Sequence, residues 1–299
     1  MAKKNHHLYL LFFLTVPTVS VITVLLRTVA LLTVYDPDAR YFNVNTLPIV
    51  CAALLIGVAV VLGIFTHEMR DFFLFTADYR DLPTLFSGIF TAIVMLFFGV
   101  TLLLSSFSEG VAVLIIAILC TLASLGGAAH FVLHAFHAGA TGTAKAMTAL
   151  PSAALAILYA LYLYFEGTMM LNNPAKVLAQ CAWVLAVFFF LGEARIALGR
   201  AKWALHSYVT VMTAILMATL SLPNLIYHAV RGTPLLGNTA QDFLALALFL
   251  YTLARLFALL CTHSREGTAE IAYATDFAAT PAPAIPAEKE NTDEEATDR

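Results

Sequence analysis

Charged residues are scarce in this sequence. Its 299 residues include 16 Lys and Arg and 19 Asp and Glu, so charged side chains make up 12% of the chain and hydrophobic ones 61%. So little charge cannot cover the surface of a water-soluble globule of this size. The composition therefore predicts a protein whose solvent is largely lipid.

Motifs of common soluble enzymes are also missing. The chain has no P-loop, GxGxxG, GxSxG or HExxH motif, and none of its four cysteines belongs to a CxxC pair. Nucleotide-dependent and hydrolase chemistries therefore have no support. The net charge of −3, without a strong basic patch, predicts no nucleic-acid partner, and no cofactor is expected.

Eight long apolar runs are present instead. Each is close to the roughly 20 residues that a helix needs to cross a hydrocarbon core, and runs such as LPIVCAALLIGVAVVLGIF lack the alternation of a membrane β-strand. The sequence predicts an all-α bundle of eight transmembrane helices in residues 1–263. The expected spans are 8–34, 46–66, 84–106, 110–134, 147–170, 175–196, 203–227 and 241–262.

The distribution of basic residues predicts the orientation. Eight spans place both termini on one side, and a cytoplasmic N-terminus assigns nine Lys and Arg to inner segments and three to outer ones. That excess is typical of cytoplasmic loops. We therefore expect a multi-pass protein of the cell membrane, with the bilayer as its partner and both termini in the cytoplasm.

The end of the chain differs from the rest. From Ser264 onward it has nine acidic and three basic residues, and from Thr280 onward three prolines. Such a composition cannot bury enough apolar surface to fold. Residues 264–299 are predicted to form a disordered acidic tail that could bind a protein partner.

Charges inside the spans are the first candidate functional residues, because a buried charge costs about 2.5 to 3.5 kcal/mol on insertion scales. By depth alone, the expected partner of Arg27 is Glu166 and that of Arg255 is Glu193. Arg195 is two residues from Glu193, so the two side chains point in different directions on a helix. These buried charges serve either a structural role or a substrate or ion path. Pro223 is interpreted as an ordinary membrane-helix kink.

Histidines form the second candidate group. His130, His134 and His137 follow one another at i, i+4 and i+7 and so share a helix face. That spacing fits interfacial hydrogen bonding, a proton-responsive cluster or a weak metal site. No second His-rich box accompanies it.

The segments YFEGTMMLNNPAK (164–176) and FLGEARIALGR (190–200) share a pattern: an acid closes one span, Asn-Pro opens the next, and an acid-x-Arg ends it. In this pattern the sequence resembles a group of multi-span bacterial membrane proteins that has no established activity. The resemblance covers mainly the fifth to seventh spans. It implies the membrane architecture and no mechanism.

Function is predicted from the buried charges. The leading hypothesis is transport or permeation of a small solute or ion through the helix bundle. A non-transporting sensor or scaffold module is the alternative, and a redox or lipid-modifying membrane enzyme comes third. An enzymatic activity is thus less expected than transport.

Overall fold

The computed structural model describes residues 2–44, 46–68, 82–108, 110–136, 142–165, 170, 172–200, 202–236 and 238–265. In this part of the chain, eight helices are long and apolar enough to cross a membrane, as the sequence predicts. The helices are α1 Ala2–Thr33, α2 Thr46–Glu68, α3 Leu82–Ser106, α4 Val111–Phe136, α5 Gly142–Phe165, α6 Pro174–Ala197, α7 Trp203–Arg231 and α8 Thr239–Arg265. Two short strands, β1 Tyr35–Asp36 and β2 Tyr41–Phe42, join α1 to α2.

Several helix boundaries differ by a few residues from the expected spans, and those of α5 and α8 are examples. Helix α5 begins at Gly142 instead of 147, because hydropathy marks only the apolar part of a helix whose first turn carries Lys145. Helix α8 continues to Arg265, so it passes the expected domain boundary at 263. Two residues of the predicted acidic tail, 264–299, therefore belong to α8, and the rest of it, 266–299, lies outside the described residues.

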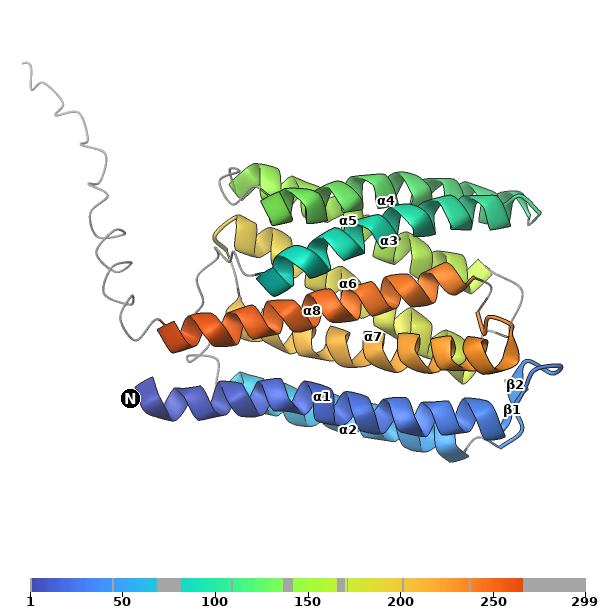
Figure 1. Ribbon diagram of the computed structural model, residues 1–299, viewed down its shortest axis with the longest axis horizontal. Coiled ribbons are helices and arrows are strands. Elements are labelled where there is room, and N and C mark those ends of the chain that lie inside the picture. Colours follow the sequence, from blue (N-terminus) through green and yellow to red (C-terminus); the bar gives the residue numbers. More distant parts are fainter. Residues whose placement is uncertain are drawn as a thin grey trace, which may run out of the picture.

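The helices lie side by side in three groups (Figure 1). Helices α3, α4 and α5 pack in sequence order on one side, and α1 and α2 form the other side. Helices α6, α7 and α8 lie between these two groups. Within this middle group and toward α1 and α2, α7 makes contacts with four helices: α1, α2, α6 and α8. Central α7 is the most buried of the eight spans, so its polar residues face protein rather than lipid.

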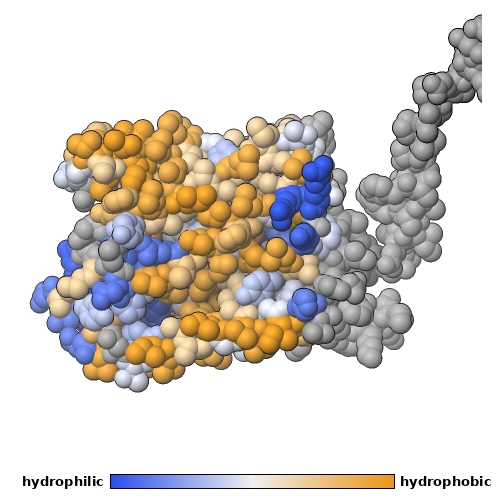
Figure 2. Space-filling view, turned by 180° about the vertical axis from the view of Figure 1, so that it is seen from behind, coloured by the Kyte–Doolittle hydropathy of each residue, from blue (hydrophilic) through white to orange (hydrophobic). Residues whose placement is uncertain are grey.

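The outer surface is apolar along the middle of the bundle. Figure 2 shows mainly hydrophobic residues across this face, with hydrophilic ones gathered toward its two ends. Ile56, Val61 and Phe86 are 65–66% exposed. Exposed apolar side chains in such number suit contact with lipid, not with water.

The hairpin and α6 are tied together at one end of the bundle. The strands are antiparallel, with Tyr35 opposite Phe42. Asn173 caps α6 because its Oδ1 accepts from the Ala175 N–H at 2.8 Å, and Pro174 occupies the first turn, where no backbone donor is needed. The same Asn173 donates through Nδ2 to the Arg40 carbonyl at 2.7 Å. The Asn-Pro pair therefore starts α6 and fixes the hairpin to it.

Candidate functional site

The first candidate site is the Glu193 centre, formed by Glu193 of α6, His206 of α7 and Arg255 of α8. All three side chains are buried. Arg255 Nη2 lies 2.9 Å from Glu193 Oε2 and 3.2 Å from Oε1, and Arg255 Nε lies 3.3 Å from Oε1. His206 Nε2 approaches the same Oε1 at 3.2 Å. The contact between Arg255 and Glu193 that depth predicted is therefore present.

Two local features place Glu193 inside the protein. Glu193 is buried whereas Arg195, two residues later, is exposed, as expected for positions on different sides of a helix. Gly192 allows α7 to approach, because a Cβ at this position would collide with His206 Nδ1. Residues 192–195 thus provide room for His206 at Gly192, a buried acid at Glu193 and an exposed base at Arg195.

The second candidate site is the Arg27 centre, formed by Arg27 of α1, Asn224 of α7 and Asp242 of α8. Arg27 is 5% exposed and its Nη2 donates to Asn224 Oδ1 at 2.8 Å. Asn224 in turn donates through Nδ2 to Asp242 Oδ1 at 2.7 Å. The amide therefore separates a buried cation from a buried acid and bonds to both.

Pro223 explains how Arg27 reaches α7. Proline has no backbone N–H and cannot donate to the carbonyl four residues earlier, that of Thr219. Arg27 Nη1 donates to this carbonyl at 2.7 Å. The hydroxyls of Thr23 and Thr219 also share a hydrogen bond of 2.7 Å between α1 and α7. The carbonyl that Pro223 leaves free in the continuous helix α7 is thus a contact point for α1.

Glu166, the expected partner of Arg27, lies outside the described residues, so this pairing stays a prediction. Sequence reasoning selected neither Asp242 nor Asn224 as a candidate site residue. Asp242 could have been selected from the sequence, because it is an acid that directly precedes the apolar run FLALALFLY. What the sequence could not supply was the lateral arrangement that brings α1, α7 and α8 together.

The histidine group is described only in part. His130 is buried, and its Nδ1 lies 3.2 Å from Thr148 Oγ1 of α5. The side chain of His134 and all of His137 lie outside the described residues. Within the described part of the chain, no three His, Cys, Asp or Glu residues are grouped so that they could hold a metal ion.

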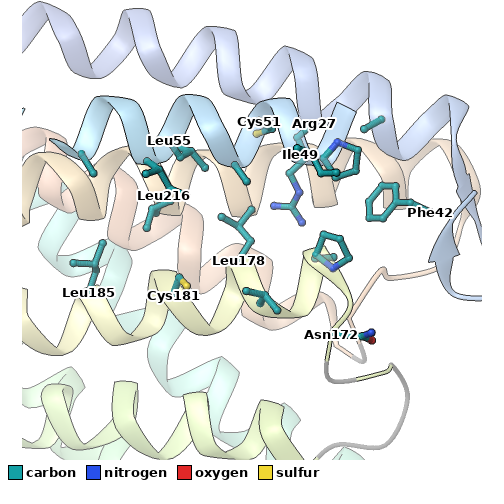
Figure 3. A pocket seen from close by; sticks show the side chains of 18 of the residues that line it. Arg27, Phe42, Ile49, Cys51, Leu55, Asn172, Leu178, Cys181, Leu185 and Leu216 are labelled. Atoms are coloured by element: carbon teal, nitrogen blue, oxygen red, sulfur yellow. The ribbon is translucent and has the colours of Figure 1, made fainter. Parts of the chain in front are cut away.

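A cleft of about 590 Å³ lies between α1 and α2 on one side and α6 and α7 on the other (Figure 3). Arg27 points into it from α1, whereas Leu55, Leu178 and Leu216 are among its apolar walls. The Glu193 centre is not part of its lining. Of the two candidate sites, the Arg27 centre therefore borders the cleft and the Glu193 centre does not.

No family model, curated protein or solved structure matches the chain.

Proposed function

We propose that this protein transports a small solute or an ion across the cell membrane, and that the polar face of α7 forms part of the path. The observation that supports this proposal is a row of buried residues on one face of the most buried helix. The row consists of His206, Thr210, Thr213, Met217, Ser221 and Asn224, spaced three or four residues apart. Five of these six side chains are polar.

This face connects the two charged centres. His206 belongs to the Glu193 centre and Asn224 to the Arg27 centre. Along α8, the distance between Asp242 and Arg255 corresponds to about 20 Å at 1.5 Å per residue. The two centres therefore lie near opposite ends of a hydrocarbon core of roughly 30 Å.

Several polar atoms beside this face retain hydrogen-bonding capacity. Within the described residues, His206 Nδ1, Ser207 Oγ, Thr213 Oγ1 and Asp242 Oδ2 are buried without a hydrogen-bond partner. Buried polar atoms usually have partners, and each exception calls for an explanation such as a functional role, a bound water or a bound ion. Carboxylates, imidazole and hydroxyls all exchange protons, so a proton is the ion that suits this face.

A non-transporting sensor or scaffold is the second candidate. Both carboxylate oxygens of Glu193 are engaged by Arg255 or His206. Aromatic rings also pack beside this centre, where Phe189 lies against His206 and Tyr251. A satisfied ion pair within a packed core suits a structural role.

Proton flux distinguishes the two functions. The full-length protein in liposomes, under a potassium-driven membrane potential, should acidify the lumen faster than protein-free liposomes. Asp242→Asn and Glu193→Gln should reduce this rate to the protein-free level, because each removes an exchangeable carboxylate. Asp36→Asn, in the hairpin, is the matched control and should retain it.

Each variant is first checked for a single symmetrical peak in size-exclusion chromatography. A wild-type rate equal to that of empty liposomes, or equal rates in all three variants, would contradict the proposed path. The sensor or scaffold function would then be favoured.

A further inference from the structure

The cleft beside Arg27 is open on the membrane-facing side. Residues on both of its walls are exposed, with Ile49 and Ile56 on α2 and Val177 and Cys181 on α6. In a bilayer this opening faces lipid tails. A lipid-soluble molecule could therefore enter sideways between α2 and α6.

Arg27 is the one charged side chain among the described residues that line the cleft. A guanidinium has five N–H donors. Three acceptors take up part of this capacity: the Thr219 carbonyl, the Leu220 carbonyl and Asn224 Oδ1. No carboxylate of the described residues contacts Arg27 directly, since Asn224 separates it from Asp242. A buried cation with two donors to spare attracts an anionic group.

The cleft beyond Arg27 is apolar. Its walls there include Leu55, Ala59, Leu178, Leu185, Met212 and Leu216. From Ala52 to Ala59 the α2 wall extends about 10 Å, and the α6 wall from Leu178 to Leu185 extends equally far. Figure 3 shows these leucines on one side of Arg27, with Phe42 and Asn172 on the other. The cation therefore lies partway along a narrow hydrocarbon-lined slot.

We propose that this cleft binds a single-chain amphiphile with a carboxylate head group, that is, a fatty acid. The carboxylate accepts from the remaining donors of Arg27, and the alkyl chain lies along the leucines toward Leu185. Arg27 precedes the end of α1 by six residues, or about 9 Å. A compact carboxylate fits at that depth, whereas the phosphate of a bilayer lipid lies at the interface. Arg27 borders the proposed proton path through Asn224, but this proposal does not rest on that path, because binding is measured without any flux.

Photocrosslinking tests the proposal. The full-length protein in lipid nanodiscs is labelled with a diazirine derivative of dodecanoic acid, and the labelled residues are mapped by mass spectrometry. Label is expected on α2 and α6 at the cleft. Unlabelled dodecanoate should compete, whereas dodecanol, which has the same chain but no charge, should compete about tenfold less well, as loss of a charged hydrogen bond implies.

Two variants separate binding from folding. Cys181 lines the cleft from α6 at a position apart from Arg27 in Figure 3, so Cys181→Trp should fill the cleft and lower labelling about tenfold. Leu191→Trp places the same side chain on the exposed surface of α6 outside the cleft and should leave labelling unchanged. Arg27→Gln should remove the preference for dodecanoate over dodecanol.

Three results would overturn the proposal. Label spread evenly over the lipid-facing helices would show that the probe only dissolves in the bilayer. Equal labelling of the Cys181→Trp and Leu191→Trp variants would exclude the cleft. Stronger competition by phosphatidic acid than by dodecanoate would assign the site to a phospholipid head group instead.

Discussion

Glu193 and Arg195 lie on the same turn of α6 in opposite environments. Glu193 is 3% exposed and bonds to Arg255, whereas Arg195 is exposed. Burial of an ion pair is favourable only when geometry and further hydrogen bonds offset the loss of water. The approach of Arg255 and His206 to one carboxylate supplies that compensation.

The first prediction is that Glu193 and Arg255 are energetically coupled. Arg255→Ala leaves a buried carboxylate unpaired and should destabilise the protein by about 3–5 kcal/mol. The double variant with Glu193→Ala should recover part of this loss, with a coupling of about 0.5–3 kcal/mol. Unfolding by sodium dodecyl sulfate in mixed micelles measures each free energy. Additive effects of the two substitutions would show that the pair is not coupled.

The second prediction concerns Gly192. An Ala Cβ here would collide with His206 Nδ1, so α6 and α7 must move apart and the cost should be about 1–3 kcal/mol. Gly57→Ala is the matched control, because a Cβ at position 57 in α2 meets nothing within 4 Å. Thermal unfolding in detergent should show a lower midpoint for the Gly192 variant alone. Equal midpoints would mean that the helices are not in close contact at Gly192.

Depth within a span predicted two residue pairs, and the pair of Arg27 with Glu166 stays a prediction because Glu166 lies outside the described residues. Arg255 and Glu193 are the charges nearest each other in depth, and they meet. Arg27 also needed a partner, but depth cannot show that Pro223 frees a carbonyl toward α1 or that Asn224 lies between Arg27 and Asp242. Those contacts depend on which helices are neighbours, and an apolar sequence specifies that through packing of many similar side chains.

Helix α7 shows how one element can position several sites. Its N-terminal half places His206 beside Glu193, and its Pro223 region binds Arg27. The existence and order of the eight helices could be predicted because lipid requires long apolar runs. The central position of α7 could not, since its hydropathy is close to that of α1 and α5.

The hairpin gives a pH-dependent prediction at the element scale. Burial, and to a lesser extent the nearby Tyr227, raises the pKa of Tyr35 in β1 to about 12. A phenol whose folded pKa exceeds its unfolded value of about 10 stabilises the fold below pH 10 and loses that contribution as the pH rises to 12. The midpoint temperature of thermal unfolding should therefore fall as the pH rises from 9 to 12.

Tyr35→Phe is the control for this pH dependence, because it removes the phenol and keeps the ring that packs edge-on against Phe42 and Tyr227. Its midpoint should fall less steeply over the same pH range. Parallel curves for the two proteins would assign the dependence to other groups.

At the scale of the whole molecule, the helices run along one axis. Which end of that axis faces the cytoplasm is predicted only from the distribution of Lys and Arg. The apolar middle of the surface suits contact with lipid, and the predicted excess of Lys and Arg on one side favours a cytoplasmic location for that side. The orientation decides which side of the membrane each candidate site is near. With the predicted topology, the Glu193 centre lies near the cytoplasm, and the Arg27 cleft lies in the outer half of the membrane.

The last prediction tests this topology with single cysteines. Lys202, before α7, and Arg231, at its end, are both exposed and lie at opposite ends of one helix. In a background without the four native cysteines, an impermeant maleimide added to intact cells should label Arg231→Cys and spare Lys202→Cys. Inverted membrane vesicles should give the reverse pattern. Because a helix of 29 residues spans about 44 Å, both positions cannot lie on one side of a membrane that α7 crosses. Labelling of Lys202→Cys from outside would show the opposite orientation, and the cleft beside Arg27 would then open toward the cytoplasmic leaflet.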